Sequence, residues 1–122
     1  RKQAAELIAG FRGHEPWGWK DPRNSLTLPF WSSLIPDLKV VVCLRNPIEV
    51  AASLQKRGYS SPRFSLRLWE TYNRMLLKAI PPRRRIVIRH DRVLANPANE
   101  LRRMLRFLGL SAQPETISQA CA

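Results

Sequence analysis

Cysteine, histidine and long apolar runs are scarce in this sequence, and each absence narrows what the chain can be. Cys43, Cys121 and two histidines are too few for a metal cluster or a disulfide framework. Cys43 lies within an apolar run, so we expect it to be a small buried side chain. No apolar segment approaches the ~20 residues that a membrane-spanning helix needs, and none resembles a signal peptide. We therefore expect a fold without a metal centre.

Acidic residues are also few, and the charge balance is strongly positive. Lys and Arg total 21 against 9 for Asp and Glu, which gives a net charge of +12, and 16 of the basic residues are Arg. Such an excess favours anionic partners: nucleic acid, anionic lipid, or a phosphorylated or sulfated small molecule. Arg suits forked contacts to phosphate in particular. Composition alone does not choose among these partners.

The length and composition fit a single globular domain. The chain has 122 residues, of which 44% are hydrophobic and 25% charged, and this argues against disorder. Single cores commonly occupy ~100–150 residues. The chain opens on Arg1 within a predicted helix, so we expect it to be a fragment of a longer domain. The residues from Ser111 onward are polar, and we expect a loose tail over 111–122.

Hydrophobic periodicity predicts an alternation of helices and strands. Helices are expected at about 4–11, 24–34, 46–57, 61–80 and 96–108, and strands at 17–20, 38–44 and 85–89. Apart from Lys39, the segment 38–44 is continuously apolar, which is typical of a strand buried on both faces. Alternating elements of this kind predict an α/β fold with a parallel sheet.

The segment from Val40 to Leu54 carries the clearest chemical signal. A buried strand leads directly into a helix that Asn46 and Glu49 would cap as a variant of the capping box. In open α/β sheets, ligands bind beyond the carboxyl ends of the strands, and a helix start there favours a phosphate. Arg45 lies at the junction and can form bidentate hydrogen bonds to phosphate oxygens. The Ser53 hydroxyl lies two turns further along the helix.

A structural interpretation of the same residues is also open. Arg45 could pair with Glu49 on the helix surface, and Ser53 could be a small residue at a helix contact. The residues alone leave both interpretations standing.

The amino-acid sequence of this segment resembles a known motif. Arg45-x-Pro-x-x-Val-Ala-x-Ser53-Leu after a hydrophobic strand is similar to the 3′-phosphate-binding motif of sulfotransferases that use 3′-phosphoadenosine-5′-phosphosulfate (PAPS). Arg45 and Ser53 match its two phosphate-contacting positions. Four further segments resemble the family in the same order, over about Trp17 to Leu110: Trp17–Arg23, Leu68–Tyr72, Ile86–Pro97 and Leu105–Leu110.

The resemblance implies a fold and an activity. The fold would be part of the three-layer, parallel-sheet, P-loop-like nucleotide-binding fold, with residues 1–122 forming a single truncated domain. The reaction would be sulfuryl transfer from PAPS to a hydroxyl or amine of a small-molecule or glycan acceptor, without a metal. Lys20 would be the catalytic residue, a fixed cation that stabilises charge on the bridging oxygen; alternatively it is a solvated lysine or pairs with Asp21.

The chain also departs from the family pattern. The Gly- and Ser/Thr-rich loop that grips the 5′-phosphosulfate has no counterpart here, so the fragment could be inactive. His14 and His90 are not assigned as a catalytic base, because His14 sits in a Gly-rich turn and His90 occupies a position that the family often fills with a structural Tyr or Glu. The competing hypothesis is a basic module that binds nucleic acid without catalysis. The expected compartment is cytoplasmic, with the Golgi lumen as the alternative.

Overall fold

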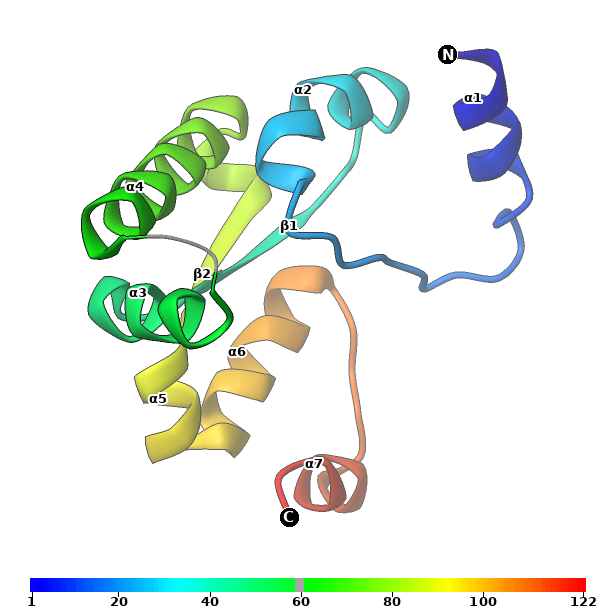
Figure 1. Ribbon diagram of the computed structural model, residues 1–122. Helices are drawn as coiled ribbons and strands as arrows, with labels where there is room; N and C mark the ends of the chain where they lie inside the picture. The colour runs from blue at the N-terminus through cyan, green and yellow to red at the C-terminus, as the bar shows by residue number, and fades with distance from the viewer. Residues whose placement is uncertain (59–60) are drawn as a thin grey trace.

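The computed structural model describes residues 1–58 and 61–122 (Figure 1). The strands are β1 (Val40–Leu44) and β2 (Arg85–Arg89). The helices are α1 (Lys2–Ala9), α2 (Asn24–Leu34), α3 (Pro47–Lys56), α4 (Pro62–Ala79), the 3-10 helix η1 (Pro82–Arg84), α5 (His90–Ala95), α6 (Pro97–Leu108) and α7 (Pro114–Ala120). The helices expected from the sequence at 24–34, 46–57, 61–80 and 96–108 are confirmed, each to within one residue at either end.

The two strands form a parallel pair whose ends are level. Val40 lies opposite Arg85 and Leu44 opposite Arg89, so β1 and β2 finish at the same edge. The connection between them runs through α3 and α4, as a parallel pair requires. In Figure 1, α4 lies on one side of the strands and α6 on the other. An α/β fold with a parallel sheet is therefore confirmed, as a small sheet of two strands among many helices.

The start of α3 is held by its capping residue. The Asn46 side chain accepts a hydrogen bond from the Ile48 N–H at 2.9 Å, and Pro47 takes the first helical position. Glu49, which the sequence predicted to bond back to Asn46, instead pairs with Arg45. The predicted cap is thus confirmed at Asn46, whereas the Glu49 side chain forms an ion pair with Arg45.

Lys39 joins the approach to β1 to the end of α6. Its ammonium donates to the carbonyls of Phe107 and Leu108 at 3.0 and 2.9 Å, where the last turn of a helix has carbonyls without intrahelical partners. Gly109 then ends α6 with φ at 76°, a conformation that favours glycine. The one charged residue in the predicted strand 38–44 therefore serves as a cap between distant segments.

A second polar contact fastens α6 to β2. Glu100 is 5% exposed, and its carboxylate accepts from Arg103 at 2.7 Å. The same Arg103 nitrogen donates to the Val87 carbonyl at 2.6 Å. A buried carboxylate is stable only when it is paired, so this contact fixes the helix on the strand.

Three expectations about local structure were wrong. Residues 17–20 form no strand; Trp17 and Trp19 stack on each other with ring centroids 5.9 Å apart, and no described strand pairs with their backbone. Cys43 is exposed rather than buried, because it alternates with the buried Val42 and faces an uncovered side of β1. The residues after Ser111 include α7, whose Ile117 is buried.

The structure also shows α5, which the sequence analysis did not predict. With six residues, α5 is too short to show an apolar stripe. Among the helices that the structure describes, none combines the length and apolarity needed to cross a membrane.

Candidate functional site

A cavity opens where β1 and β2 end. Its volume is about 580 Å³, and it lies at the edge of the sheet where ligands of open α/β folds bind. Polar and apolar side chains from the two strand ends and from α3, α4 and α5 line it: Leu44, Arg45, Asn46, Pro47, Glu49, Trp69, Arg89, His90, Asp91 and Leu94. Because β1 and β2 end at the same edge, the ends of the two strands line one cavity although they are more than 40 residues apart in the sequence.

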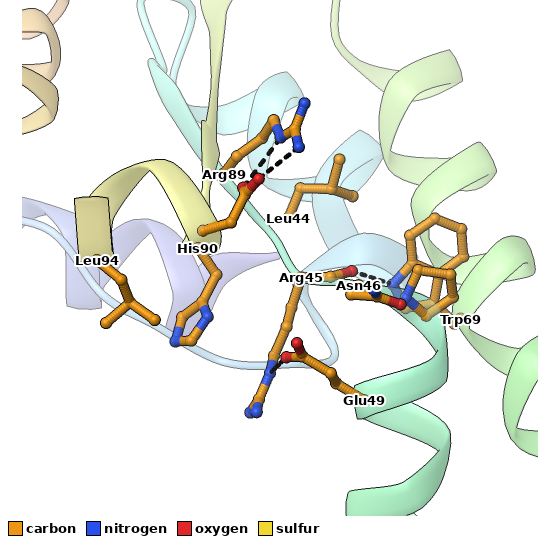
Figure 2. A pocket seen from close by; sticks show the side chains of 10 residues that line it. Leu44, Arg45, Asn46, Glu49, Trp69, Arg89, His90 and Leu94 are labelled. Atoms are coloured by element: carbon orange, nitrogen blue, oxygen red, sulfur yellow. Dashed lines mark hydrogen bonds and ion pairs between the residues drawn. The ribbon is translucent and has the colours of Figure 1, made fainter. Parts of the chain in front are cut away.

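Arg45 and Glu49 form an ion pair on this cavity. Arg45 Nε donates to Glu49 Oε2 at 2.8 Å, and the two side chains are 48% and 51% exposed. Figure 2 shows the terminal nitrogens of Arg45 projecting beyond the carboxylate. The pair that the sequence left open as a structural interpretation is therefore present. An exposed pair of this kind contributes little to stability, about 0–1 kcal/mol, so the arginine can exchange one anion for another at small cost.

The backbone of Arg45 is held more firmly than its side chain. Trp69, on α4, donates its indole N–H to the Arg45 carbonyl at 3.2 Å, and Asn46 caps α3 immediately afterwards. Figure 2 shows the Trp69 ring beside Asn46, with the Arg45 side chain extending away from both. The root of the arginine is thus fixed while its guanidinium remains at the solvent-facing side of the cavity.

The end of β2 contributes a second arginine. Arg89 Nε donates to Asp91 Oδ1 at 3.0 Å. The hydrogen bond from Arg89 lowers the pKa of the Asp91 carboxyl, and the same bond raises the pKa of Arg89. Figure 2 shows the Arg89 guanidinium and the Arg45 guanidinium pointing in different directions, with His90 on the Arg45 side. The cavity therefore has Arg45, Glu49 and His90 at one side and the Arg89–Asp91 pair at another.

The three predicted site residues, Arg45, Ser53 and Lys20, do not all line the cavity. Arg45 lines the cavity. Ser53 is half-buried on α3, one turn beyond Glu49 on the same face, and Lys20 is exposed in the segment between α1 and α2. Neither Ser53 nor Lys20 is among the described residues that line the cavity. Asp21, the alternative partner of Lys20, is paired with Arg23 at 2.6 Å, and hydrogen bonds from Arg23 lower its pKa to about 2.

Sequence reasoning missed the contribution of β2 to the site. Arg89, His90 and Asp91 line the cavity, yet none was assigned a role there. The signal that could have found them is positional: they follow a predicted strand, and parallel strands end at the same edge of a sheet.

Comparison with known families decides what kind of protein this cavity belongs to. A family model described as "Sulfotransferase family" matches residues 1–114. The chain belongs to the sulfotransferase family. Comparison with curated proteins and with solved structures gives no match. Membership confirms the resemblance seen in the segments around Arg45 and makes sulfuryl transfer, in general terms, the reaction of the family to which this chain belongs.

The sulfotransferase chain shows no metal-binding cluster in the part that the structure describes: no three His, Cys, Asp or Glu side chains come together there. The ionisable side chains that line its cavity are those of Arg45, Glu49, Arg89, His90 and Asp91. The two arginines, Arg45 and Arg89, can bind and orient an anion by hydrogen bonds and charge.

Proposed function

We propose that this chain binds the 3′-phosphate of PAPS at Arg45 and Ser53, as part of a domain that transfers the sulfuryl group to a hydroxyl or amine acceptor. PAPS would supply the sulfuryl group, and the acceptor would be a small molecule or a glycan. The observation that carries the proposal is Arg45 at the carboxyl end of β1, on a cavity of about 580 Å³, in a chain that belongs to the sulfotransferase family.

The surroundings of Arg45 support a phosphate site. Its backbone is fixed by Trp69, and its guanidinium is about half exposed beside the start of α3. A helix start attracts anions, and a guanidinium can fork onto two phosphate oxygens. The residues of the cavity therefore fit a phosphate, on the condition that the Glu49 carboxylate releases Arg45.

Ser53 supports the same placement through the geometry of α3. It follows Glu49 by one helical turn, about 6 Å along the axis, and lies on the same face. A phosphate bound over this face would meet Arg45 at one end and could accept a hydrogen bond from the Ser53 hydroxyl at the other. Glu49 lies between these two positions.

Two finer parts of the proposal rest on the family resemblance rather than on the cavity. The first is that β1 and β2 are part of the larger sheet of the three-layer, P-loop-like fold. The second is that Lys20 acts as a fixed cation toward the bridging oxygen during transfer. Replacing Lys20 by Met in the intact protein should lower kcat and leave affinity for the nucleotide unchanged if that role is correct.

A basic nucleic-acid-binding module is the second candidate, because the chain carries a net charge of +12. The two candidates predict different dependence on salt. Nucleic-acid binding through many phosphate contacts loses about 10³-fold or more in affinity between low and moderate salt. A single nucleotide at one arginine depends on salt far less.

The test is a calorimetric titration with adenosine 3′,5′-bisphosphate, which carries the 3′-phosphate without the sulfuryl group. We expect one-site binding that weakens about 10- to 100-fold in Arg45→Ala and about 5-fold in Ser53→Ala. Arg74→Ala is the matched control, because Arg74 forms the same kind of pair with Glu70 four residues away, on α4. Equal losses in Arg45→Ala and Arg74→Ala, or no binding by a folded chain, would refute the site.

A further inference from the structure

The Arg45–Glu49 pair occupies the place where the phosphate is proposed to bind. Glu49 Oε2 accepts from Arg45 Nε at 2.8 Å, and the carboxylate lies on the face of α3 between Arg45 and Ser53. Both members of the pair line the cavity. In the structure, a carboxylate thus takes the position of an anionic ligand on the arginine.

We propose that Glu49 is an internal competitor for Arg45, which lowers the affinity of the cavity for the 3′-phosphate of a nucleotide. This inference rests on the proposed function and adds a residue to it. Glu49 acts through Arg45, so it is a positioning residue rather than a catalytic one. Its carboxylate holds the guanidinium until an anion that binds more strongly replaces it.

The charges of the two anions explain how a phosphate can replace the carboxylate on Arg45. A phosphate monoester carries close to two negative charges near neutral pH and offers three acceptor oxygens, whereas a carboxylate carries one charge and two oxygens. A dianion can therefore displace Glu49 from Arg45, whereas a singly charged anion gains little by the exchange. The carboxylate that remains close by also repels the phosphate that Arg45 holds, which lowers the affinity further.

The surrounding contacts make such an exchange possible without moving the backbone. The Arg45 carbonyl is bonded to the Trp69 indole and α3 begins at the Asn46 cap, and neither contact involves the guanidinium. Both side chains of the pair are about half exposed, so each can rotate into solvent. Water can replace both partners of such an exposed pair, so the structure allows Glu49 to swing aside at small cost.

The variant that tests the inference is Glu49→Gln, which keeps the size of the side chain and removes its charge. We expect its affinity for adenosine 3′,5′-bisphosphate to rise about 5-fold, from the lost competition and the lost repulsion. Affinity for adenosine 5′-monophosphate, which has no 3′-phosphate, should be unchanged. Glu70→Gln is the matched control, because Glu70 pairs with Arg74 in the same spacing on α4.

A second measurement reports on Arg45 itself. The Nε–H signal of Arg45 in nuclear magnetic resonance should change position when Glu49→Gln removes its partner, and should also move when the bisphosphate is added to the unaltered chain. Thermal unfolding of each variant checks that the fold is kept. Glu49 is half exposed, so we expect its replacement to change the stability to thermal unfolding only slightly, as is usual for surface residues.

The outcomes separate this inference from the proposed function. Tighter binding by Glu49→Gln, or binding by Glu49→Gln when the unaltered chain binds nothing, supports the competitor. Binding that depends on Arg45 but is equal or weaker in Glu49→Gln overturns the competitor and leaves the phosphate site in place. Absence of binding in both folded chains overturns both proposals. An equal gain in Glu70→Gln would show a general charge effect and overturn the role of Glu49.

Discussion

Removing Arg103 should destabilise the chain because it leaves Glu100 buried without a partner. Glu100 is 5% exposed, and Arg103 bonds both its carboxylate and the Val87 carbonyl, at 2.7 and 2.6 Å. Removing one member of a fully buried pair costs about 3–5 kcal/mol. The Arg103 side chain is 39% exposed, so water can reach the vacated position, and we reduce the expected loss for Arg103→Met to about 2–3 kcal/mol.

The assay is urea denaturation followed by far-ultraviolet circular dichroism, with Arg102→Met as control. Arg102 is an exposed arginine on the same helix, so its replacement makes the same change in charge. We expect the control to stay within about 0.5 kcal/mol of the unaltered chain. Typical domains are stable by only about 5–15 kcal/mol, so the loss in Arg103→Met would be easy to resolve.

The double variant Glu100→Leu/Arg103→Met completes the argument. Replacing both charges by apolar groups removes the buried carboxylate as well as its partner, so stability should return to within about 1 kcal/mol of the starting value. If Arg103→Met costs no more than the Arg102→Met control, or if the double variant is less stable than Arg103→Met, the reasoning about a buried carboxylate is refuted.

Three further predictions concern contacts on or near the cavity. Trp69→Phe removes the bond to the Arg45 carbonyl and should weaken binding of adenosine 3′,5′-bisphosphate about 3- to 10-fold in calorimetry. Lys39→Met removes the cap of α6 and should cost about 1 kcal/mol in urea denaturation, with little effect on nucleotide affinity. Arg89 lowers the pKa of Asp91, so the stability that Asp91 contributes is present above the ordinary aspartate pKa and is lost as the pH falls through the lowered one. Asp91→Asn should therefore be less stable than the unaltered chain near neutral pH and equally stable in strong acid, as measured by urea midpoints over that range.

The helices α2, α3, α4 and α6 were predictable because their signals are local. Asn46 and Asn96 each cap a helix whose first residue is proline, and the structure shows both side chains bonded to N–H groups of the first turn. Such signals depend on residues close in sequence. The same holds for β1, whose apolar residues predicted a strand without knowledge of its neighbour.

The wrong predictions concern contacts between a segment and its neighbours in the fold. Residues 17–20 have strand-like composition, yet a strand needs a partner, and none of the described strands pairs with them. Cys43 lies in an apolar run, but its exposure depends on whether a helix covers its face of β1. Neither fact can be obtained from the residues of the segment alone.

The part of the candidate site that lies in one continuous segment, directly after β1, was predictable from the sequence. Arg45 follows β1 directly, so its position at the strand end could be predicted from a single stretch of sequence. The contribution of Arg89 and His90 depends on the register between β1 and β2, which are joined by a connection of 40 residues, from 45 to 84. Whether Arg45 pairs with Glu49 was left open, because the choice of side-chain rotamer lies beyond what spacing can decide.

The contact between Lys39 and the last turn of α6 has a consequence for how the chain is made. During synthesis, β1 emerges from the ribosome long before residues 107 and 108, whose carbonyls Lys39 binds. Its parallel partner, β2, also emerges late, after the whole connection through α3 and α4. β1, which carries Arg45 at its end, is therefore synthesised before both of the segments that hold it, and its backbone has no β2 to pair with until the connection is complete.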